Sequence, residues 1–245
     1  SESDTLLDIV VEQNDFLDSQ QEAFQLTLLD DTLTRVVFED NRLIDSSADS
    51  DSETGVQIAM ENNSQLLMDF TGNTIQGHGG AGLLSVAPPN PDWSEGFKLT
   101  VADTSTASLR AINNEISESA FEGMRMDVSG TGVINALVLD NRFRDNDLAF
   151  SDPNEPTGER DFIAEKLSAG SEICLSLHNN FANTGEGYLI DNAGGGSPIE
   201  MELGINTPTP TTNGAVNITV FDEFVSTCIT NIEAEEAAFS AAGFP

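Results

Sequence analysis

The chain has 245 residues, of which 42 are acidic and 9 are basic, so its formal net charge is −33. A surface of this sign repels nucleic acid and anionic membranes, and it favours cations, high salt or plain solubility. An apolar content of 38 % and 14 phenylalanines argue against a disordered chain. No apolar run reaches the roughly 18 residues of a membrane span, and the length is typical of one domain.

A first strand is predicted at residues 5–11, which are mostly apolar and lead to Asn14. No amphipathic segment stands before this strand to cover the open end of a sheet. We therefore expect the first coil to be covered by a preceding domain or by another copy of the protein. Ser1 as the first residue is typical of a processed chain, so a signal peptide is expected to have been removed.

From residue 24 onward the chain repeats one pattern. Five alternating strands each begin 17 residues before an asparagine, at Phe24, Val56, Phe97, Met124 and Phe162. The asparagines that open the repeated Asn-x-apolar tripeptides are Asn14, Asn41, Asn73, Asn114, Asn141 and Asn179. A coil body of fixed length with loops of variable length is typical of a solenoid, and period-two alternation indicates strands. The sequence thus predicts an all-β parallel β-helix of about six to eight coils over residues 1–205, with its variable loops on one side.

The asparagines and glycines of the repeat predict its turns. We expect each asparagine to adopt the left-handed conformation and to hydrogen-bond the equivalent asparagine one coil away, which would form a ladder. Glycines precede several strands and are expected at positive φ, where the loops re-enter the sheet. These glycines are Gly55, Gly96, Gly123 and Gly187.

Three long loops, at 44–55, 76–96 and 144–161, carry candidate ligand residues. The first loop alternates acidic and small residues, which suits Ca²⁺ but equally suits a solvated acidic loop. Its candidate ligands are Asp45, Asp49, Asp51 and Glu53. The second loop holds Trp93, whose ring would stack on a sugar or a partner, or else pin the loop to its own solenoid.

Two columns of side chains are predicted on the outward face of the first strand of each coil. One column holds Gln25, Gln57, Lys98, Arg125, Ile163 and Leu189. The other column holds Thr27, Ala59, Thr100, Asp127, Glu165 and Asp191. Carboxylates stacked about 4.8 Å apart repel one another unless a cation or a proton lies between them. A ligand site is one interpretation of these columns, and ordinary cross-strand ion pairs on a sheet surface are the other.

The histidines and cysteines give no metal or nucleophile signature. His78, between two glycines, is expected to be exposed in its loop, and His178 is expected at a turn or on the surface. Two cysteines are too few for a zinc cluster or a disulfide framework. Cys174 is expected to be a buried thiol, with a disulfide to Cys228 as the alternative.

Beyond residue 205 the repeat stops. Residues 207–212 are predicted to form an extended, proline-restricted linker, residues 215–224 a strand, and residues 229–242 a short helix or a polar tail. Segment 206–245 is expected either to cap the last coil or to dock on a neighbouring subunit or domain.

The repeat geometry resembles the pectate-lyase-like superfamily of right-handed parallel β-helices, over roughly residues 5–205. The last coils are also similar to those of large bacterial surface proteins with such repeats. The superfamily resemblance implies a polysaccharide groove lined by the first sheet and the loops. In lyases of this family a basic residue beside calcium-binding carboxylates abstracts a sugar proton, which implies Lys98 or Arg125 as base near Asp127 and Glu165. Gly77-His78-Gly79 resembles a polygalacturonase motif, but the other motifs of those hydrolases are not found here.

These observations predict an extracellular or cell-surface module with a structural or adhesive role in a bacterial surface protein or filament. Its expected partners are a glycan, or another copy or domain of the same protein, and its cofactor is either Ca²⁺ or none. Two alternatives remain open, because a fold does not decide a function. One is a polysaccharide lyase or glycoside hydrolase acting on acidic polysaccharide, and the other is a self-assembling filament subunit.

Overall fold

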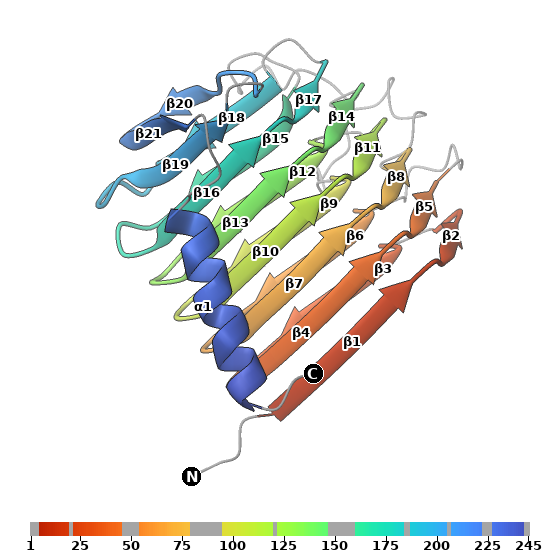
Figure 1. Ribbon diagram of the computed structural model, residues 1–245, viewed down its shortest axis with the longest axis horizontal. Coiled ribbons are helices and arrows are strands. Elements are labelled where there is room, and N and C mark those ends of the chain that lie inside the picture. Colours follow the sequence, from red (N-terminus) through yellow and green to blue (C-terminus); the bar gives the residue numbers. More distant parts are fainter. Residues whose placement is uncertain are drawn as a thin grey trace, which may run out of the picture.

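A computed structural model of the chain describes residues 5–19, 22–45, 54–78, 95–119, 122–146, 160–183, 187–204, 207–221 and 227–242. This part of the chain is a parallel β-helix, as predicted. Successive strands pass from one sheet to the next, and each strand pairs in parallel with its equivalent one coil away (Figure 1). None of its helices is both long and apolar enough to cross a membrane.

The described strands form three sheets of eight, six and seven strands. Sheet A contains β1 (Thr5–Glu12), β4 (Thr32–Glu39), β7 (Gln65–Thr71), β10 (Thr106–Ile112), β13 (Val133–Leu139), β16 (Glu172–His178), β19 (Ile199–Gly204) and β21 (Val216–Phe221). Sheet B contains β2 (Asp15–Leu17), β5 (Arg42–Ile44), β8 (Thr74–Gln76), β11 (Glu115–Ser117), β14 (Arg142–Arg144) and β17 (Phe181–Ala182). Sheet C contains β3 (Phe24–Leu28), β6 (Val56–Met60), β9 (Phe97–Val101), β12 (Met124–Val128), β15 (Arg160–Lys166), β18 (Gly187–Asp191) and β20 (Thr211–Asn213).

The core lies between the three sheets and is filled by the inward side chains of the alternating strands. In sheet C, the predicted strand starts stand side by side, because Phe24, Val56, Phe97 and their equivalents pair in register. Aromatic rings continue from coil to coil, with centroids 5.6 Å apart for Phe38 and Phe70 and 4.8 Å apart for Phe70 and Phe97. Burial of these columns fixes the register, since a slip by one residue would turn every apolar side chain outward.

The predicted asparagine ladder is present at the turn between sheets A and B. The backbone N–H of Asn73 donates to Oδ1 of Asn114 at 2.9 Å, and the N–H of Asn114 donates to Oδ1 of Asn141 at 2.9 Å. The left-handed residue, however, is the one before each asparagine and not the asparagine itself. These residues are Gln13, Asp40, Gly72, Asn113, Asp140 and Asn179, with φ between 49° and 69°.

The last member of the ladder is Asn180, so the prediction of Asn179 is wrong. The N–H of Asn141 donates to Oδ1 of Asn180 at 2.9 Å, whereas Asn179 is exposed and donates to Asp140. The turn between sheets C and A is one residue longer in this coil. From the end of β12 at Val128 to the start of β13 at Val133 the chain advances five positions. From Lys166, which pairs with Val128, to Glu172, which pairs with Val133, it advances six.

Glycines at the start of the sheet C strands serve close packing between coils. A Cβ on Gly96 would collide with Cγ2 of Ile116 and would lie 2.7 Å from the carbonyl oxygen of Gly123. A Cβ on Gly123 would lie 2.7 Å from Nδ2 of Asn146. Of the four glycines expected at positive φ, only Gly187 adopts it. At Gly55, Gly96 and Gly123 the reason for glycine is space rather than backbone conformation.

Helix α1 (Thr227–Ala242) lies across the outer face of sheet A (Figure 1). Its Ile232 and Phe239 are buried against Leu67 on β7 and Leu137 on β13. Cys228 forms a disulfide with Cys174 on β16, so the prediction of a free thiol is wrong. The disulfide therefore fixes the first turn of the helix to the β-helix.

The segment after residue 205 adds to the β-helix before it forms α1. β20 pairs with β18, and β21 pairs with β19 from Ile199↔Val216 to Gly204↔Phe221. The strand and the helix predicted in this segment are thus both present. The assignment of residues 206–245 as a cap of the last coil or as a docking segment stays a prediction.

Candidate functional site

The outward face of sheet C brings the predicted charged residues together. Lys98 on β9 pairs in register with Arg125 on β12, and Thr100 on β9 pairs with Asp127 on β12. Asp127 in turn pairs with Glu165 on β15. The two columns are therefore aligned as predicted, and this outward face of β9, β12 and β15 is the candidate site.

A second row of acidic residues lies just before the strands of sheet C. Glu95 and Glu122 each stand three residues before the basic side chain of their own strand, in the repeated order Glu-Gly-apolar-Lys/Arg. The carbonyl of Glu122 accepts a hydrogen bond from the N–H of Gly96, which joins the two neighbouring coils at this point. The repeated order is the sequence signal by which Glu95 and Glu122 could have been found, although neither was predicted.

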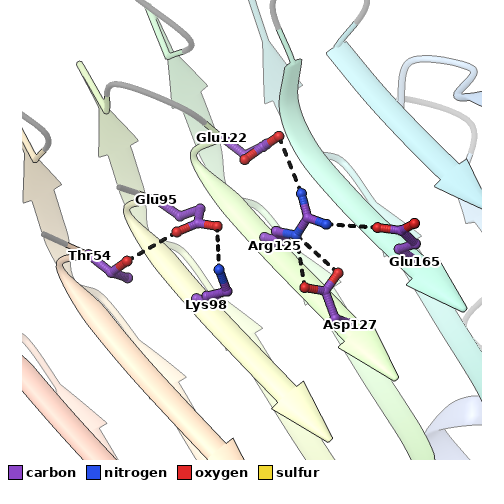
Figure 2. A network of polar contacts seen from close by, with 7 residues as sticks. All are labelled: Thr54, Glu95, Lys98, Glu122, Arg125, Asp127 and Glu165. Atoms are coloured by element: carbon purple, nitrogen blue, oxygen red, sulfur yellow. Dashed lines mark hydrogen bonds and ion pairs between the residues drawn. The ribbon is translucent and has the colours of Figure 1, made fainter. Parts of the chain in front are cut away.

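Lys98 is paired with the buried carboxylate of Glu95 (Figure 2). Its Nζ lies 2.9 Å from Oε1 of Glu95, while Oγ1 of Thr54 donates to the other oxygen, Oε2, at 3.0 Å. The side chain of Glu95 is fully buried, and that of Lys98 is only 17 % exposed. A buried carboxylate needs such donors, because a charge without partners inside the protein is costly.

Arg125 is surrounded by three carboxylates, as Figure 2 shows. Its Nε lies 2.9 and 3.0 Å from the two oxygens of Asp127, and its Nη2 lies 2.7 Å from Oε2 of Glu165. Nη1 lies 3.7 Å from Oε1 of Glu122. The cation that the stacked carboxylates require is thus supplied, for Asp127 and Glu165, by this guanidinium.

The surroundings of Arg125 hold its proton firmly. Burial lowers its pKa, but the charge and the hydrogen bonds of Asp127 and the charges of Glu122 and Glu165 outweigh burial, and the pKa is raised above its ordinary value. A general base must instead be able to accept a proton near the working pH. The arrangement is suited to binding two coils to one another and poorly suited to proton abstraction by Arg125.

Asp191 stands apart from this cluster. It is in register with Glu165, but its Oδ1 accepts a hydrogen bond from Nδ2 of Asn213 at 3.0 Å, on the following strand of sheet C. Within the described ranges, no group of three or more His, Cys, Asp or Glu residues could hold a metal ion. The ion pairs in this column are those that Asp127 and Glu165 form with Arg125.

One of the predicted loop ligands lies in the described part of the chain. Asp45 is buried at the end of β5, and its N–H donates to the carbonyl of Gln76 at 2.9 Å. Asp49, Asp51, Glu53 and Trp93 lie outside the described residues. A calcium site in the first loop and an aromatic contact from the second loop stay predictions.

Both histidines are buried, contrary to expectation. His78 follows β8 at the corner where the second loop leaves, and it is 1 % exposed. His178 ends β16, and its Nε2 lies 2.9 Å from Oγ of Ser176. Burial lowers the pKa of His178 and outweighs the opposite effect of the Glu202 charge. Neither imidazole is an exposed loop group.

A second polar contact, between α1 and sheet A, was also not predicted. Arg110 on β10 forms ion pairs with Glu236 of α1 and with Asp69 of β7. The hydrogen bond and charge of Glu236 raise the pKa of Arg110 despite its partial burial. No sequence pattern links residues this far apart, so only the structure reveals the pair.

Comparisons of the chain with protein-family models, curated proteins and solved structures found no match. The β-helix and its charged face are therefore the basis for assigning a function.

Proposed function

We propose that the chain is an extracellular structural or adhesive module of a bacterial surface protein or filament, built on the β-helix of the pectate-lyase-like superfamily. The observation that carries this proposal is the engagement of Arg125, the candidate base, by Asp127, Glu165 and Glu122. An arginine with a raised pKa and a side chain only 15 % exposed serves cohesion between coils. The same observation weakens the alternative of a lyase or hydrolase acting on acidic polysaccharide.

The location outside the cell is supported by the bond between Cys174 and Cys228. Disulfides form and persist in oxidising environments and are rare in the cytosol.

In this proposal the outward face of sheet C contacts a glycan. From β3 to β12, polar side chains occupy one column throughout and the other except at Ala59, and a regular spacing of about 4.8 Å presents them to an extended ligand. Trp93 is proposed to add a stacking surface. The first loop, with Asp45, is proposed to bind Ca²⁺ through its hard oxygen ligands.

The discriminating experiment measures unsaturated product by ultraviolet absorbance with a panel of uronic-acid polysaccharides, with and without Ca²⁺. We expect no product from the wild type, and retention of the protein on at least one immobilised acidic or neutral glycan. Product that forms with the wild type and disappears with Arg125→Ala would contradict the proposal and establish a lyase.

The same variant should report a structural role. We expect Arg125→Ala to lower the free energy of unfolding by roughly 2–3 kcal/mol, less than the cost of breaking a fully buried pair because solvent screens this one in part. Arg42→Ala is the matched control, since Arg42 pairs with Asp15 at an exposed position and should cost no more than about 1 kcal/mol. Equal effects of the two variants in urea unfolding would remove the structural argument.

A further inference from the structure

Sheet A has a free edge at each end of the described β-helix. β1 stands at one end of its strand order and β21 at the other. Both edge strands expose apolar side chains that belong to the inward face, namely Leu7 at 39 %, Ile218 at 42 % and Val220 at 65 %. Free backbone groups and core side chains at a strand edge are a template for pairing with another chain.

The inward side chains of sheet A form three columns, and every strand from β1 to β21 contributes one residue to each column. On β1 they begin with Leu7, Ile9 and Val11, which pair with Thr34, Val36 and Phe38 of β4. On β21 they finish with Val216, Ile218 and Val220, which pair with Ile199, Met201 and Leu203 of β19. Placing β21 of one copy beside β1 of another would therefore continue all three apolar columns without a change of register.

Charge favours the same match. β21 has the sequence VNITVF and carries no charged side chain, whereas β1 carries Asp8 and Glu12. In the continued register, Asp8 would lie beside Asn217 and Glu12 beside Phe221, so no like charges would meet across the contact. Most other surfaces of a chain with net charge −33 would repel this acidic edge.

We propose that the protein assembles head to tail, with β21 of one copy pairing in parallel with β1 of the next. This inference deepens the proposed structural role by naming a second copy of the chain as the partner. The contact is heterologous, because it joins two different edges. Such contacts give open filaments when the rotation between copies does not close a ring.

The test uses two variants that each block one edge, and it measures assembly state by sedimentation velocity in moderate to high salt, where repulsion is screened. Val220→Lys places a charge in the column at the β21 edge, and Leu7→Lys does the same at the β1 edge. Both positions are exposed in the single copy, so the circular dichroism spectra of the two variants should match that of the wild type. Leu167→Lys, at an exposed turn between β15 and β16, is the matched control.

We expect the wild type and Leu167→Lys to form concentration-dependent oligomers, and each edge variant alone to be a monomer. An equimolar mixture of the two edge variants should form a dimer and stop there, since one intact β1 edge meets one intact β21 edge. The proposal would be overturned if the wild type were a monomer at all concentrations. It would also be overturned if either edge variant formed the same oligomers as the wild type, or if the mixture of the two variants formed no heterodimer. The glycan and lyase assays do not depend on assembly, so failure here is distinguishable from failure of the proposed function.

Discussion

From the second coil onward, the side chain of each ladder asparagine satisfies two backbone groups of the preceding coil. The buried side chain of Asn114 accepts from the N–H of Asn73 and donates to the carbonyl of Phe70 at 2.8 Å. Removing this side chain therefore leaves a backbone N–H and a backbone carbonyl of the preceding coil without partners inside the protein, where water cannot replace the lost bonds.

We expect Asn114→Ala to lower the free energy of unfolding by about 2–4 kcal/mol, because each buried polar group that loses its partner costs about 1–3 kcal/mol. The matched control is Asn14→Ala, since Asn14 occupies the same ladder position in an exposed coil. Urea unfolding of both variants measures the difference. Similar losses for the two variants would show that the ladder draws no stability from its burial.

Much of the ladder is predictable from the sequence, but its last member is not. Asn179 and Asn180 are adjacent, and Phe181 made Asn179 look like the start of an Asn-x-apolar tripeptide. In the structure Phe181 is 48 % exposed, and Ala182 takes the inward place beside Phe143. The extra residue in the turn before β16 shifts the following residues by one position, so Phe181 faces outward and Ala182 faces inward. A count of residue spacings cannot detect this shift, because both candidates for the ladder position are asparagines.

At the scale of the element, α1 is the one described helix, and it crosses several coils of sheet A (Figure 1). Apolar contacts of Ile232 and Phe239, the ion pair of Glu236 with Arg110, and the disulfide hold it in place. The outer face of sheet A below it carries Leu67 and Leu137, which the helix shields from water. The helix thus completes a second, smaller apolar cluster outside the β-helix core.

Reduction of the disulfide should loosen α1. A bond that closes a loop of this length typically stabilises a protein by about 2–4 kcal/mol, so the reduced protein should melt at a lower temperature. Uncovering of Leu67 and Leu137 should raise the fluorescence of a hydrophobic dye and speed amide exchange within α1. In the Cys174→Ser/Cys228→Ser variant, which lacks both cysteines of the chain, the reductant should have no further effect. Unchanged exchange in α1 after reduction of the wild type would show that the helix is held without the bond.

The existence of this helix was predictable, but its position was not. Residues 229–242 contain no proline or glycine and are rich in alanine and glutamate, which favours a helix. Its apolar positions are few, and they match an outward stripe on sheet A whose members come from strands far apart in sequence. Charged residues such as Arg110 lie within the same stripe, so alternation along single strands does not reveal it.

At the scale of the whole molecule, the dominant feature is the excess of negative charge. Neighbouring coils lie about 4.8 Å apart, which is well within the screening length of about 10 Å at 0.1 M salt. Acidic side chains on adjacent coils therefore repel one another at low salt. Paired groups such as Arg125 and Glu165 oppose this effect locally, but 9 basic residues cannot pair 42 acidic ones.

We expect the melting temperature to rise as sodium chloride is added from low to moderate concentration, because salt screens the net repulsion more than it weakens the few partly buried pairs. Val220→Lys should be used, so that assembly does not contribute, and a chelator should exclude bound calcium. A melting temperature that falls with salt would mean that the ion pairs, rather than the excess charge, set the electrostatic balance.

The disulfide determines which strands bear the load when the chain is stretched by its two ends. The bond between Cys174 and Cys228 encloses β17, β18, β19, β20 and β21 in a covalent loop. Tension applied between the two ends of the chain would pass through the sulfur bridge from β16 directly to α1 and would bypass these strands. The last coils would then bear no load, and extension would begin with the peeling of α1 or of the coils before β16. In a protein exposed to shear, such a bridge would keep the β21 edge folded while the rest of the solenoid carries the force.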